Sequence, residues 1–540
     1  MQIIIPMSGF GERFRSYGYE IPKPLIEVEG LSFINHVVNL FSPHDSFFFI
    51  CNEDHLKEKK FNMRKIIYKN CKNSKIISIK PHKLGPIHAI TKIKNYLNLD
   101  ESVVVNYCDF TCYWNWRDFK KEIKNYDGII PAYKGFHPHS LGDTNYAYIQ
   151  NINDTVIDIQ EKQPFTSNKM NEYASSGTYF FKSASLMFKA FEYVIKEDLS
   201  INGEYYVSMA YKYLLNNKLN VKIYPLQHFM QWGTPEDLDE YKHWSNTFKK
   251  ILNFKFFKHI KDHNLIMPMA GFGKRFKESG FKLPKPLIDI SGESMMIQAV
   301  KFLPMCNNNY FILRKDKFTN LIKQKLVKNL KNTKIVELDK PTDGQASSCL
   351  IGINKIKNLN PVTISACDNG VIYDQKKLYK ALNQDYDILV WGTKLHYNSN
   401  RNPEMYGWIE IDKNNLIKKI SVKKKEKSSS HIVIGTFTFK NKNIFIKSYD
   451  QLIMKKDKVK NEYYVDSMIN HSLKIGYKCL LLEVDNFISW GTPNEYNTFQ
   501  YWQSCFHKWK YHPYLLENDP FIKSNKLKSL KKLSENFKKN

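Results

Sequence analysis

The amino-acid sequence predicts an α/β protein made of two tandem domains, each built on a doubly wound, mostly parallel sheet. Three observations lead to this prediction: the length of 540 residues, an internal repeat that covers most of the chain, and short β-branched runs that alternate with helical patterns inside each repeat. A single hydrophobic core rarely organises more than about 250–300 residues, so the length alone favours two domains.

The repeat consists of six matches that occur in the same order in both halves of the chain. The segment M-S-G-F-G-E-R-F at 7–14 recurs as M-A-G-F-G-K-R-F at 269–276, and I-P-K-P-L-I at 21–26 recurs as L-P-K-P-L-I at 283–288. The other matched segments are 108–109 with 367–368, 177–178 with 435–436, 204–207 with 462–465, and 232–235 with 490–493. This spacing is far longer than a solenoid repeat, so we infer that a whole domain is duplicated.

The matches predict the domain boundaries. Domain 1 is expected at 1–245 and domain 2 at 264–502. Residues 246–263 are basic and aromatic and are interpreted as a linker, preferably an amphipathic helix that packs one copy on the other. Residues 503–540 form a basic C-terminal tail, in which the lysine-rich end from 526 onward favours a frayed helix or disorder.

Within copy one, strands and helices are expected to alternate. Strands are predicted at 2–6, 47–51, 75–79, 103–107 and 128–132, and helices at 31–40, 87–96 and 116–125. Strands joined by helical crossovers form Rossmann-like parallel sheets, in which ligands bind beyond the carboxyl ends of the strands. The loop at 8–11 and Asp109 each follow a predicted strand directly, so both are expected at that edge.

The composition narrows the class of protein. The net charge of +28 is compatible with nucleic acid, an anionic membrane surface or phosphorylated substrates as partners. Lysine is spread along the chain without an arginine-rich arm, so we favour solvated faces, expect no specific nucleic-acid binding and leave weak membrane-surface association open. We expect no transmembrane segment and no secretory signal, reduced cysteines and a cytoplasmic location, with an oligomer left open.

The segment around the first glycines has the properties of a phosphate-binding loop. Glycines after a strand let backbone N–H groups approach phosphate oxygens, and the planar fork of Arg13 suits a triphosphate. Prolines on both sides of Lys23 stiffen its backbone, and a lysine is a suitable charge for a phosphoryl group that becomes more negative during a reaction.

This G-x-G-x-R-F motif followed by P-K-P resembles the signature of the sugar-phosphate nucleotidyltransferases. The resemblance covers both copies, and the wording of the motifs is most similar to members linked to capsule and lipopolysaccharide synthesis. It implies transfer of a nucleoside monophosphate from a nucleoside triphosphate to a sugar 1-phosphate, with Mg²⁺ and release of pyrophosphate.

The resemblance also implies a role for individual residues. In copy one, Arg13 and Lys23 would be catalytic, Asp109 would bind Mg²⁺, Ser8, Gly9, Gly11 and Gly85 would bind the nucleotide, and Glu161, Lys162 and Gly177 would bind the acceptor. In copy two, Arg275 and Lys285 would be catalytic and Asp368 would bind Mg²⁺. The nucleotide would be bound by Gly271, Gly273, Gly344 and Gln345, and the acceptor by Lys423 and Gly435.

The sequence departs from the family pattern at the metal and acceptor sites. Many members have a second metal-binding aspartate where this chain has Gln231 and Ser489, and the glutamate before the acceptor lysine is replaced by Val422 in copy two. We therefore expect copy one to be catalytic and leave the activity of copy two open. For His137 and His139, loop or acceptor-contact roles are favoured over metal binding.

Two other functions stay open at this stage. The chain could be a regulatory protein that binds nucleotides or sugar phosphates, with one or both copies inactive. It could also be a glycosyltransferase, although that chemistry does not require the paired glycine and P-K-P motifs. The acceptor could be another phosphate ester, such as phosphocholine.

Overall fold

The computed structural model describes residues 1–257, 259–304, 306–394 and 396–536. The chain divides into two compact units. Unit 1 is mainly Met1–Tyr241 and includes Lys508–His512, and unit 2 consists of Lys242–His507 and Pro513–Lys532. No helix in the described part of the chain has the length and apolar character needed to cross a membrane.

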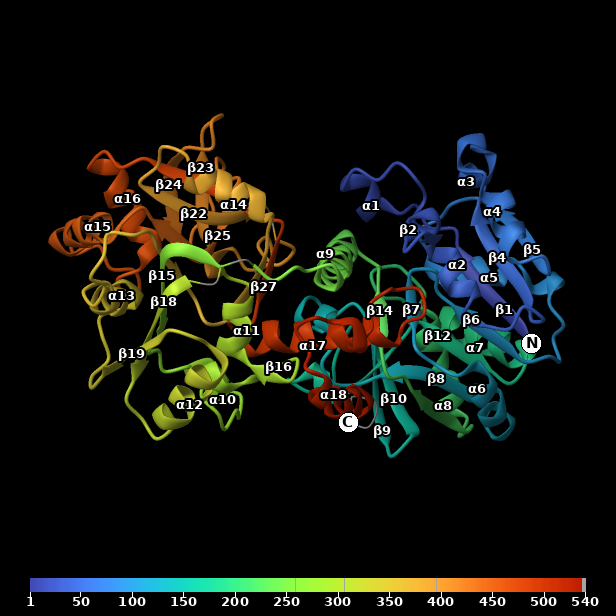
Figure 1. Ribbon diagram of the computed structural model, residues 1–540. Helices are drawn as coiled ribbons and strands as arrows, with labels where there is room; N and C mark the ends of the chain where they lie inside the picture. The colour runs from blue at the N-terminus through green and yellow to red at the C-terminus, as the bar shows by residue number, and fades with distance from the viewer. Residues whose placement is uncertain (258, 305, 395, 537–540) are drawn as a thin grey trace. The chain divides into compact units, whose positions relative to one another are not determined.

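Unit 1 is built on one mixed sheet with the strand order β11-β9-β10-β13-β8-β12-β6-β1-β4-β5 (Figure 1). Strands β1, β4, β5 and β6 are parallel, whereas β12 lies antiparallel between β6 and β8. The strands are β1 (Gln2–Met7), β4 (Ser46–Asn52), β5 (Ser74–Ile79), β6 (Val103–Asn106), β8 (Gly128–Tyr133), β9 (Ala147–Ile152), β10 (Thr155–Glu161), β11 (Tyr173–Ser175), β12 (Thr178–Phe181) and β13 (Val221–Pro225).

Apolar side chains cover both faces of this sheet. Along β1, Ile4 packs into one buried cluster, while Ile3 and Ile5 pack into the cluster on the other face. This explains why β1 is almost continuously apolar, as expected for a strand buried on both sides. The helices of unit 1 are α1 (Glu12–Ser16), α2 (Phe33–Val38), α3 (Glu53–Lys57), α4 (Met63–Asn70), α5 (Gly85–Thr91), α6 (Trp116–Glu122), α7 (Ala184–Lys196) and α8 (Tyr211–Asn216).

Unit 2 repeats this architecture, with the strand order β19-β18-β15-β20-β25-β22-β26 and β23 pairing with β24 and β25. Its strands are β15 (Ile260–Met269), β18 (Cys306–Arg314), β19 (Thr333–Leu338), β20 (Val362–Ser365), β22 (Ile388–Lys394), β23 (Gly407–Ile411), β24 (Ile417–Val422), β25 (His431–Phe439) and β26 (Cys479–Glu483). Its helices are α10 (Lys274–Glu278), α11 (Met295–Lys301), α12 (Thr319–Asn329), α13 (Gln345–Ile353), α14 (Gln375–Leu382), α15 (Lys442–Met454), α16 (Val465–Lys474) and α17 (Pro493–Lys508).

The fold class predicted from the sequence is confirmed in both units. The five predicted strands of copy one are present, and the three predicted helices are shorter than expected. The helix predicted from 31 begins at Phe33, because Leu31–Ser32 forms β3, which pairs with β2 (Glu27–Val28). The antiparallel strand β12 was not predicted.

The segments at the predicted boundaries are largely regular. The described part of 246–263 includes the end of α9 (Pro235–Leu252) and the first residues of β15, and residue 258 lies outside the described residues. The last part of the chain contains the end of α17 and the helix α18 (Ser524–Asn536). The final four residues, 537–540, lie outside the described residues.

Candidate functional site

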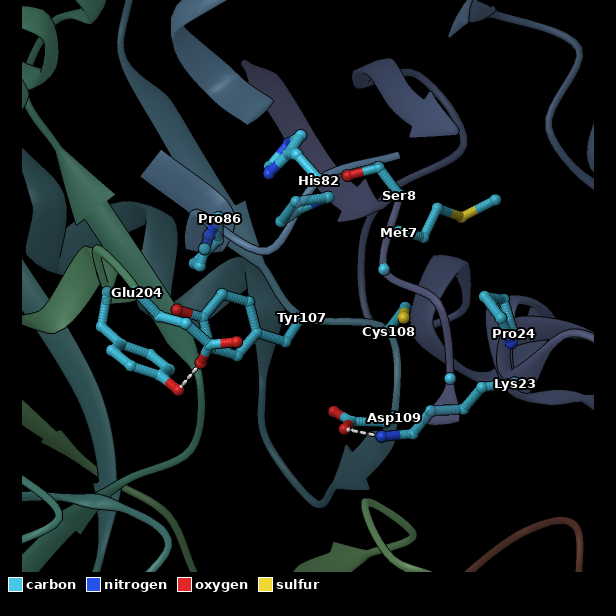
Figure 2. A pocket seen from close by; sticks show the side chains of 15 residues that line it. Met7, Ser8, Lys23, Pro24, His82, Pro86, Tyr107, Cys108, Asp109 and Glu204 are labelled. Carbon is cyan, nitrogen blue, oxygen red and sulfur yellow. Dashed lines mark hydrogen bonds and ion pairs between the residues drawn. The ribbon is translucent and has the colours of Figure 1, made fainter. Parts of the chain in front are cut away.

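A cavity of about 350 Å³ opens in unit 1 where β1 and β6 end (Figure 2). The structure brings six of the predicted site residues together in its wall: Ser8, Gly9, Gly11, Lys23, Gly85 and Asp109. In Figure 2, Lys23 and Asp109 point toward one another at one end of the cavity, and Glu204 lies at the other. A volume of this size is in the usual range for a small-molecule site.

A second hollow of about 440 Å³ shares Gly9, Gly11 and Lys23 with this cavity. Arg13 lies in its wall and is exposed to solvent. Arg13 is therefore accessible to a triphosphate bound at the glycine loop, as its predicted role requires. The corresponding Arg275 is also exposed.

The glycine loop turns through the left-handed region of backbone conformation. Gly11 has φ 68° and precedes α1, and Gly273 has φ 60° and precedes α10. A side chain is rarely accommodated at such a φ. At Gly273 an added Cβ would also lie 3.5 Å from the Cβ of Lys285, so the loop and its lysine are closely packed.

Lys23 is held by two groups that come from distant parts of the chain. Its Nζ donates to Asp109 Oδ2 at 2.6 Å and to the Gly233 carbonyl at 2.8 Å. In unit 2, Lys285 donates to Asp368 and, at 3.0 Å, to the Gly491 carbonyl. Burial acts to lower the pKa of Lys285, but the adjacent Asp368 carboxylate outweighs it and raises that pKa. Lys285 is thus held as a cation.

A short antiparallel pair of strands places these partners. In unit 1, β7 (Phe110–Cys112) pairs with β14 (Phe229–Gln231), and the Trp232 N–H donates to the Asp109 carbonyl at 3.0 Å. In unit 2, β21 (Asn369–Ile372) and β27 (Asn486–Ser489) do the same, with Trp490 donating to Asp368 at 2.8 Å. This pairing explains why the W-G-T-P segment is repeated in the sequence.

The oxygen atoms around each aspartate can be compared with what Mg²⁺ requires. In unit 1, Asp109 Oδ2 lies 3.2 Å from the point where a Cβ on Gly233 would be, and Gln231 places its amide nitrogen there rather than an oxygen. In unit 2, Asp368 Oδ2, Glu495 Oε2 and Ser489 Oγ all lie within 3.4 Å of the point where a Cβ on Gly491 would be. Within the described residues, no group of three or more His, Cys, Asp and Glu could hold a metal. Mg²⁺ usually takes one or two carboxylates and completes its shell with water and substrate phosphates, so these hard oxygen donors fit it.

The predicted acceptor lysines share an unusual backbone conformation. Lys162 has φ 59° and Lys423 has φ 58°. Their ammonium groups donate to the hydroxyls of Tyr206 at 2.7 Å and Tyr464 at 3.0 Å. A left-handed residue other than glycine costs about 1–2 kcal/mol, and both units retain it at the same place. Tyr206 lines the cavity, so the Lys162 ammonium lies next to it.

Glu161 precedes this lysine and is buried at the end of β10. The Ser208 hydroxyl donates to its carboxylate at 2.6 Å. Burial raises the pKa of Glu161 to about 7, against the opposing effects of Ser208 and Lys162. In unit 2 the equivalent position is Val422 at the end of β24.

The remaining predicted residues are divided between the two units. The Gly177 carbonyl accepts a hydrogen bond from Tyr107 N, at 3.0 Å, and Tyr107 lines the cavity. Gly435 occupies the equivalent position within β25, and Gln345 is the first residue of α13. Ser8 is buried, whereas Gly271 is exposed.

His137 and His139 pack among aromatic rings. The ring of His137 lies 4.4 Å from that of Tyr133, and His139 Nε2 lies 2.8 Å from the Tyr133 hydroxyl. Burial lowers the pKa of His137 to about 4, so this imidazole is neutral at physiological pH. The expectation that favours loop or acceptor-contact roles for these two histidines over metal binding stays a prediction.

The E-Y-Y-V segment was not predicted to belong to the site, although its repetition in both halves of the sequence could have indicated this. Glu204 and Tyr206 line the cavity, and the Tyr206 hydroxyl donates to Glu204. The backbone of Tyr205 donates to the Leu84 carbonyl at 3.0 Å and accepts from Ile87 at 3.2 Å.

The close approach of this segment explains the predicted glycines Gly85 and Gly344. Gly85 has φ 82°, and an added Cβ would lie 2.6 Å from the Tyr205 nitrogen. Gly344 has φ 122°, and its Cβ would lie 2.5 Å from the Tyr463 nitrogen. Only a glycine fits at these two positions without moving the E-Y-Y-V backbone.

The nucleotidyl transferase family model matches residues 2–238 and 264–475, which together are more than half of the chain. The chain belongs to the nucleotidyl transferase family. The match falls once in each unit, so the family resemblance and the tandem arrangement inferred from the sequence are confirmed. The finer assignment to a sugar phosphate substrate is not part of this match.

Solved structures similar to this nucleotidyl transferase include two nucleotide-processing proteins. The nucleoside-diphosphate-sugar pyrophosphorylase from Vibrio cholerae RC9 shares 18% identity, with 44% of this chain and 98% of that chain covered and a TM-score of 0.37. The inositol-1-phosphate CTP transferase from T. maritima shares 14% identity, with 46% and 98% covered and a TM-score of 0.37. A search of curated proteins found no match.

Proposed function

We propose that this nucleotidyl transferase moves a nucleoside monophosphate from a nucleoside triphosphate to a sugar 1-phosphate or a similar phosphate ester. The product would be an activated sugar for capsule or lipopolysaccharide synthesis in the cytoplasm. The proposal is carried by one arrangement: a lysine held between an aspartate and a backbone carbonyl beside a left-handed glycine loop, as Lys23 is in unit 1. Unit 2 repeats it with Lys285.

The reaction that fits these residues needs no covalent intermediate with the protein. An oxygen of the acceptor phosphate attacks the α-phosphorus in line, the new P–O bond forms, and the bond to the β-phosphate oxygen breaks to release pyrophosphate. Such a transfer depends on positioning and on neutralising charge. In this scheme Arg13 and Lys23 face the triphosphate, and Lys162 holds the phosphate of the acceptor.

Mg²⁺ is the proposed cofactor, with Asp109 and Asp368 as its protein ligands. When bound, Mg²⁺ would neutralise the phosphate oxygens and so stabilise the developing negative charge. Each of these carboxylates already pairs with a lysine ammonium, Asp109 with Lys23 and Asp368 with Lys285, so the lysine would lie beside a bound Mg²⁺.

The direct test is pyrophosphate release by the purified full chain with Mg²⁺, each nucleoside triphosphate and a panel of sugar 1-phosphates and phosphocholine. Lys23→Ala and Lys285→Ala are compared separately. Loss of a positioned charge of this kind lowers kcat by about 100-fold or more, so the affected variant identifies the working unit. Full activity in both single variants and in the double variant would contradict the site assignment.

The same screen separates the other two functions. A regulatory protein would bind nucleotide or sugar phosphate without releasing pyrophosphate. A glycosyltransferase would transfer a sugar from a supplied nucleotide sugar, also without pyrophosphate. Calorimetry with the same ligands detects the first of these, and a sugar-transfer assay with a supplied nucleotide sugar detects the second.

A further inference from the structure

The acceptor sides of the two units can be aligned residue by residue from backbone contacts. Lys162 N donates to the Tyr146 carbonyl at 2.9 Å, and Lys423 N donates to the Tyr406 carbonyl at 2.9 Å. In the strand registers, Glu161 pairs with Ala147 and Val422 pairs with Gly407. Val422 therefore corresponds to Glu161, and Gly407 corresponds to Ala147.

The residue after each E-Y-Y-V segment completes the comparison. It is Ser208 in unit 1 and Asp466 in unit 2. In unit 1, Ser208 donates to the Glu161 carboxylate. In unit 2, a Cβ added to Gly407 would overlap the Oδ2 atom of Asp466. In unit 2, Val422 therefore replaces the strand carboxylate of Glu161, and Asp466 places a carboxylate where unit 1 has Ser208. Gly407, which replaces Ala147, leaves space for the Asp466 side chain.

The relocated carboxylate lies in the electrostatic environment of the acceptor lysine. Burial raises the pKa of Asp466 to about 6, and the Lys423 charge opposes that increase. The pKa of Lys423 is lowered by burial and by Lys460 and Arg275, and raised by Glu462 and Asp466. Unlike Glu161, which is buried, Asp466 keeps part of its surface exposed.

A further difference enlarges the same region of unit 2. Tyr107, which precedes Cys108-Asp109, is replaced by Ala366 before Cys367-Asp368. An added Cβ on Gly177 would lie 3.0 Å from the Tyr107 ring, whereas one on Gly435 would lie 3.7 Å from the Ala366 Cβ. Burial is the main cause of the raised pKa of Tyr107, and Tyr179 and the Glu161 carboxylate add to it, so Glu161 lies near this ring, which lines the cavity of unit 1.

We propose that Asp466 selects the acceptor in unit 2, and that the two units take different phosphate esters. Unit 2 binds the bulkier, hydroxylated ester: its phosphate lies on Lys423, and one of its hydroxyls donates a hydrogen bond to Asp466. This inference rests on the proposed function, because it assigns Lys423 to an acceptor phosphate.

The test uses the full chain carrying Lys162→Ala, so that unit 2 supplies the remaining acceptor site. The probes are glucose 1-phosphate, inositol 1-phosphate and phosphocholine, which has no hydroxyl, and Kd is measured by calorimetry beside KM for pyrophosphate release. For a hydroxylated probe, Asp466→Asn and Asp466→Ser are expected to raise Kd by about tenfold or more, because a charged hydrogen-bond partner is lost. For phosphocholine and for the nucleoside triphosphate, Kd should stay within about twofold.

A double-mutant cycle with Gly407 provides a second variant that keeps Asp466. Gly407→Ala alone should weaken hydroxylated probes to a similar extent, because its Cβ displaces the Asp466 carboxylate. In the Asp466→Ser background the same change should have little effect, since the smaller side chain leaves room for it. Ala147→Gly in unit 1 is the matched control.

The outcomes separate this inference from the proposed function. If no probe releases pyrophosphate but a hydroxylated probe binds and loses affinity in Asp466→Asn, the proposed transfer fails, while the role of Asp466 in selecting the bound phosphate ester is supported. If Asp466→Asn and Asp466→Ser lower Tm without changing Kd for any hydroxylated probe, Asp466 only stabilises α16 and the inference is overturned. It is also overturned if none of the hydroxylated probes binds to unit 2.

Discussion

Unit 1 and unit 2 hold the residues proposed to face the triphosphate in the same way, but differ at the proposed acceptor. The lysine, aspartate and glycine carbonyl contacts recur almost atom for atom. Around Lys162 and Lys423, by contrast, the neighbouring carboxylate comes from a strand in unit 1 and from a helix in unit 2. Transfer from a triphosphate makes one fixed set of electrostatic demands, whereas an acceptor can vary in shape and in hydroxyl positions. The duplicated domain has therefore changed where its chemistry permits change.

The largest expected effect tests whether the aspartate beside the lysine has the same role in both units. Asp109→Ala and Asp368→Ala should each lower the kcat of the unit that carries them by about 100-fold or more, since each removes the carboxylate that contacts the lysine and is proposed to bind Mg²⁺. Pyrophosphate release and the Mg²⁺ dependence of nucleotide binding measure this. Unchanged Mg²⁺ dependence in Asp109→Ala would show that this carboxylate is not the metal ligand.

The next effect concerns the glycines that contact the E-Y-Y-V backbone. Gly85→Ala and Gly344→Ala should each lower the free energy of unfolding by about 2–4 kcal/mol, because the added Cβ meets backbone at a positive φ. Denaturant unfolding measures the loss. Gly9→Ala and Gly271→Ala are matched controls, because no atom lies within 4 Å of either added Cβ. Equal effects in control and test variants would contradict this explanation.

A pH dependence should distinguish the buried carboxylate of unit 1. Because the pKa of Glu161 is about 7 in the folded protein and 4.5 when exposed, the folded state binds the extra proton between these values. Its stabilising contribution is therefore complete below about pH 4.5 and is lost as the pH rises through 7, by at most about 3 kcal/mol.

Glu161→Gln should remove this loss, so the variant gains stability relative to wild type as the pH is raised from 4.5 to 8. Urea unfolding across that range tests the sign. Val422→Gln in unit 2 replaces no ionisable group and should leave the pH dependence unchanged. A parallel pH dependence in wild type and Glu161→Gln would exclude Glu161 as its source.

The smallest effect compares the tyrosines that hold the acceptor lysines. Tyr206→Phe and Tyr464→Phe each remove one hydrogen bond to a lysine ammonium, which contributes about 1 kcal/mol. We expect the acceptor KM of the affected unit to rise about fivefold, with little change in the nucleotide KM. A change in the nucleotide KM alone would assign these tyrosines to nucleotide binding rather than to acceptor binding.

The region near Lys23 could be predicted from the sequence, because its features depend on short stretches of chain. A strand, two glycines and a lysine between prolines define the loop, and their recurrence around Lys285 separates them from ordinary turns. Glu204 and Tyr206 recur equally well but received no role, because a repeated motif does not reveal which cavity it borders. Their position depends on the contact between Tyr205 and the Gly85 loop.

By itself, then, the sequence determined the duplication, the α/β class and the glycine, lysine and aspartate set, since these follow from local patterns that occur twice. Only the tertiary structure identified the residues that surround the proposed acceptor lysines. Read along the chain, Val422 appears as the loss of a carboxylate, and Asp466 as an ordinary residue at a helix start. Only the register of β23 and β24 brings Gly407 and Val422 to the same place as Asp466. The physical reason is that a charge in a pocket can come from any element that packs there. Two pockets can therefore hold a carboxylate at a similar place although it comes from different positions in the sequence.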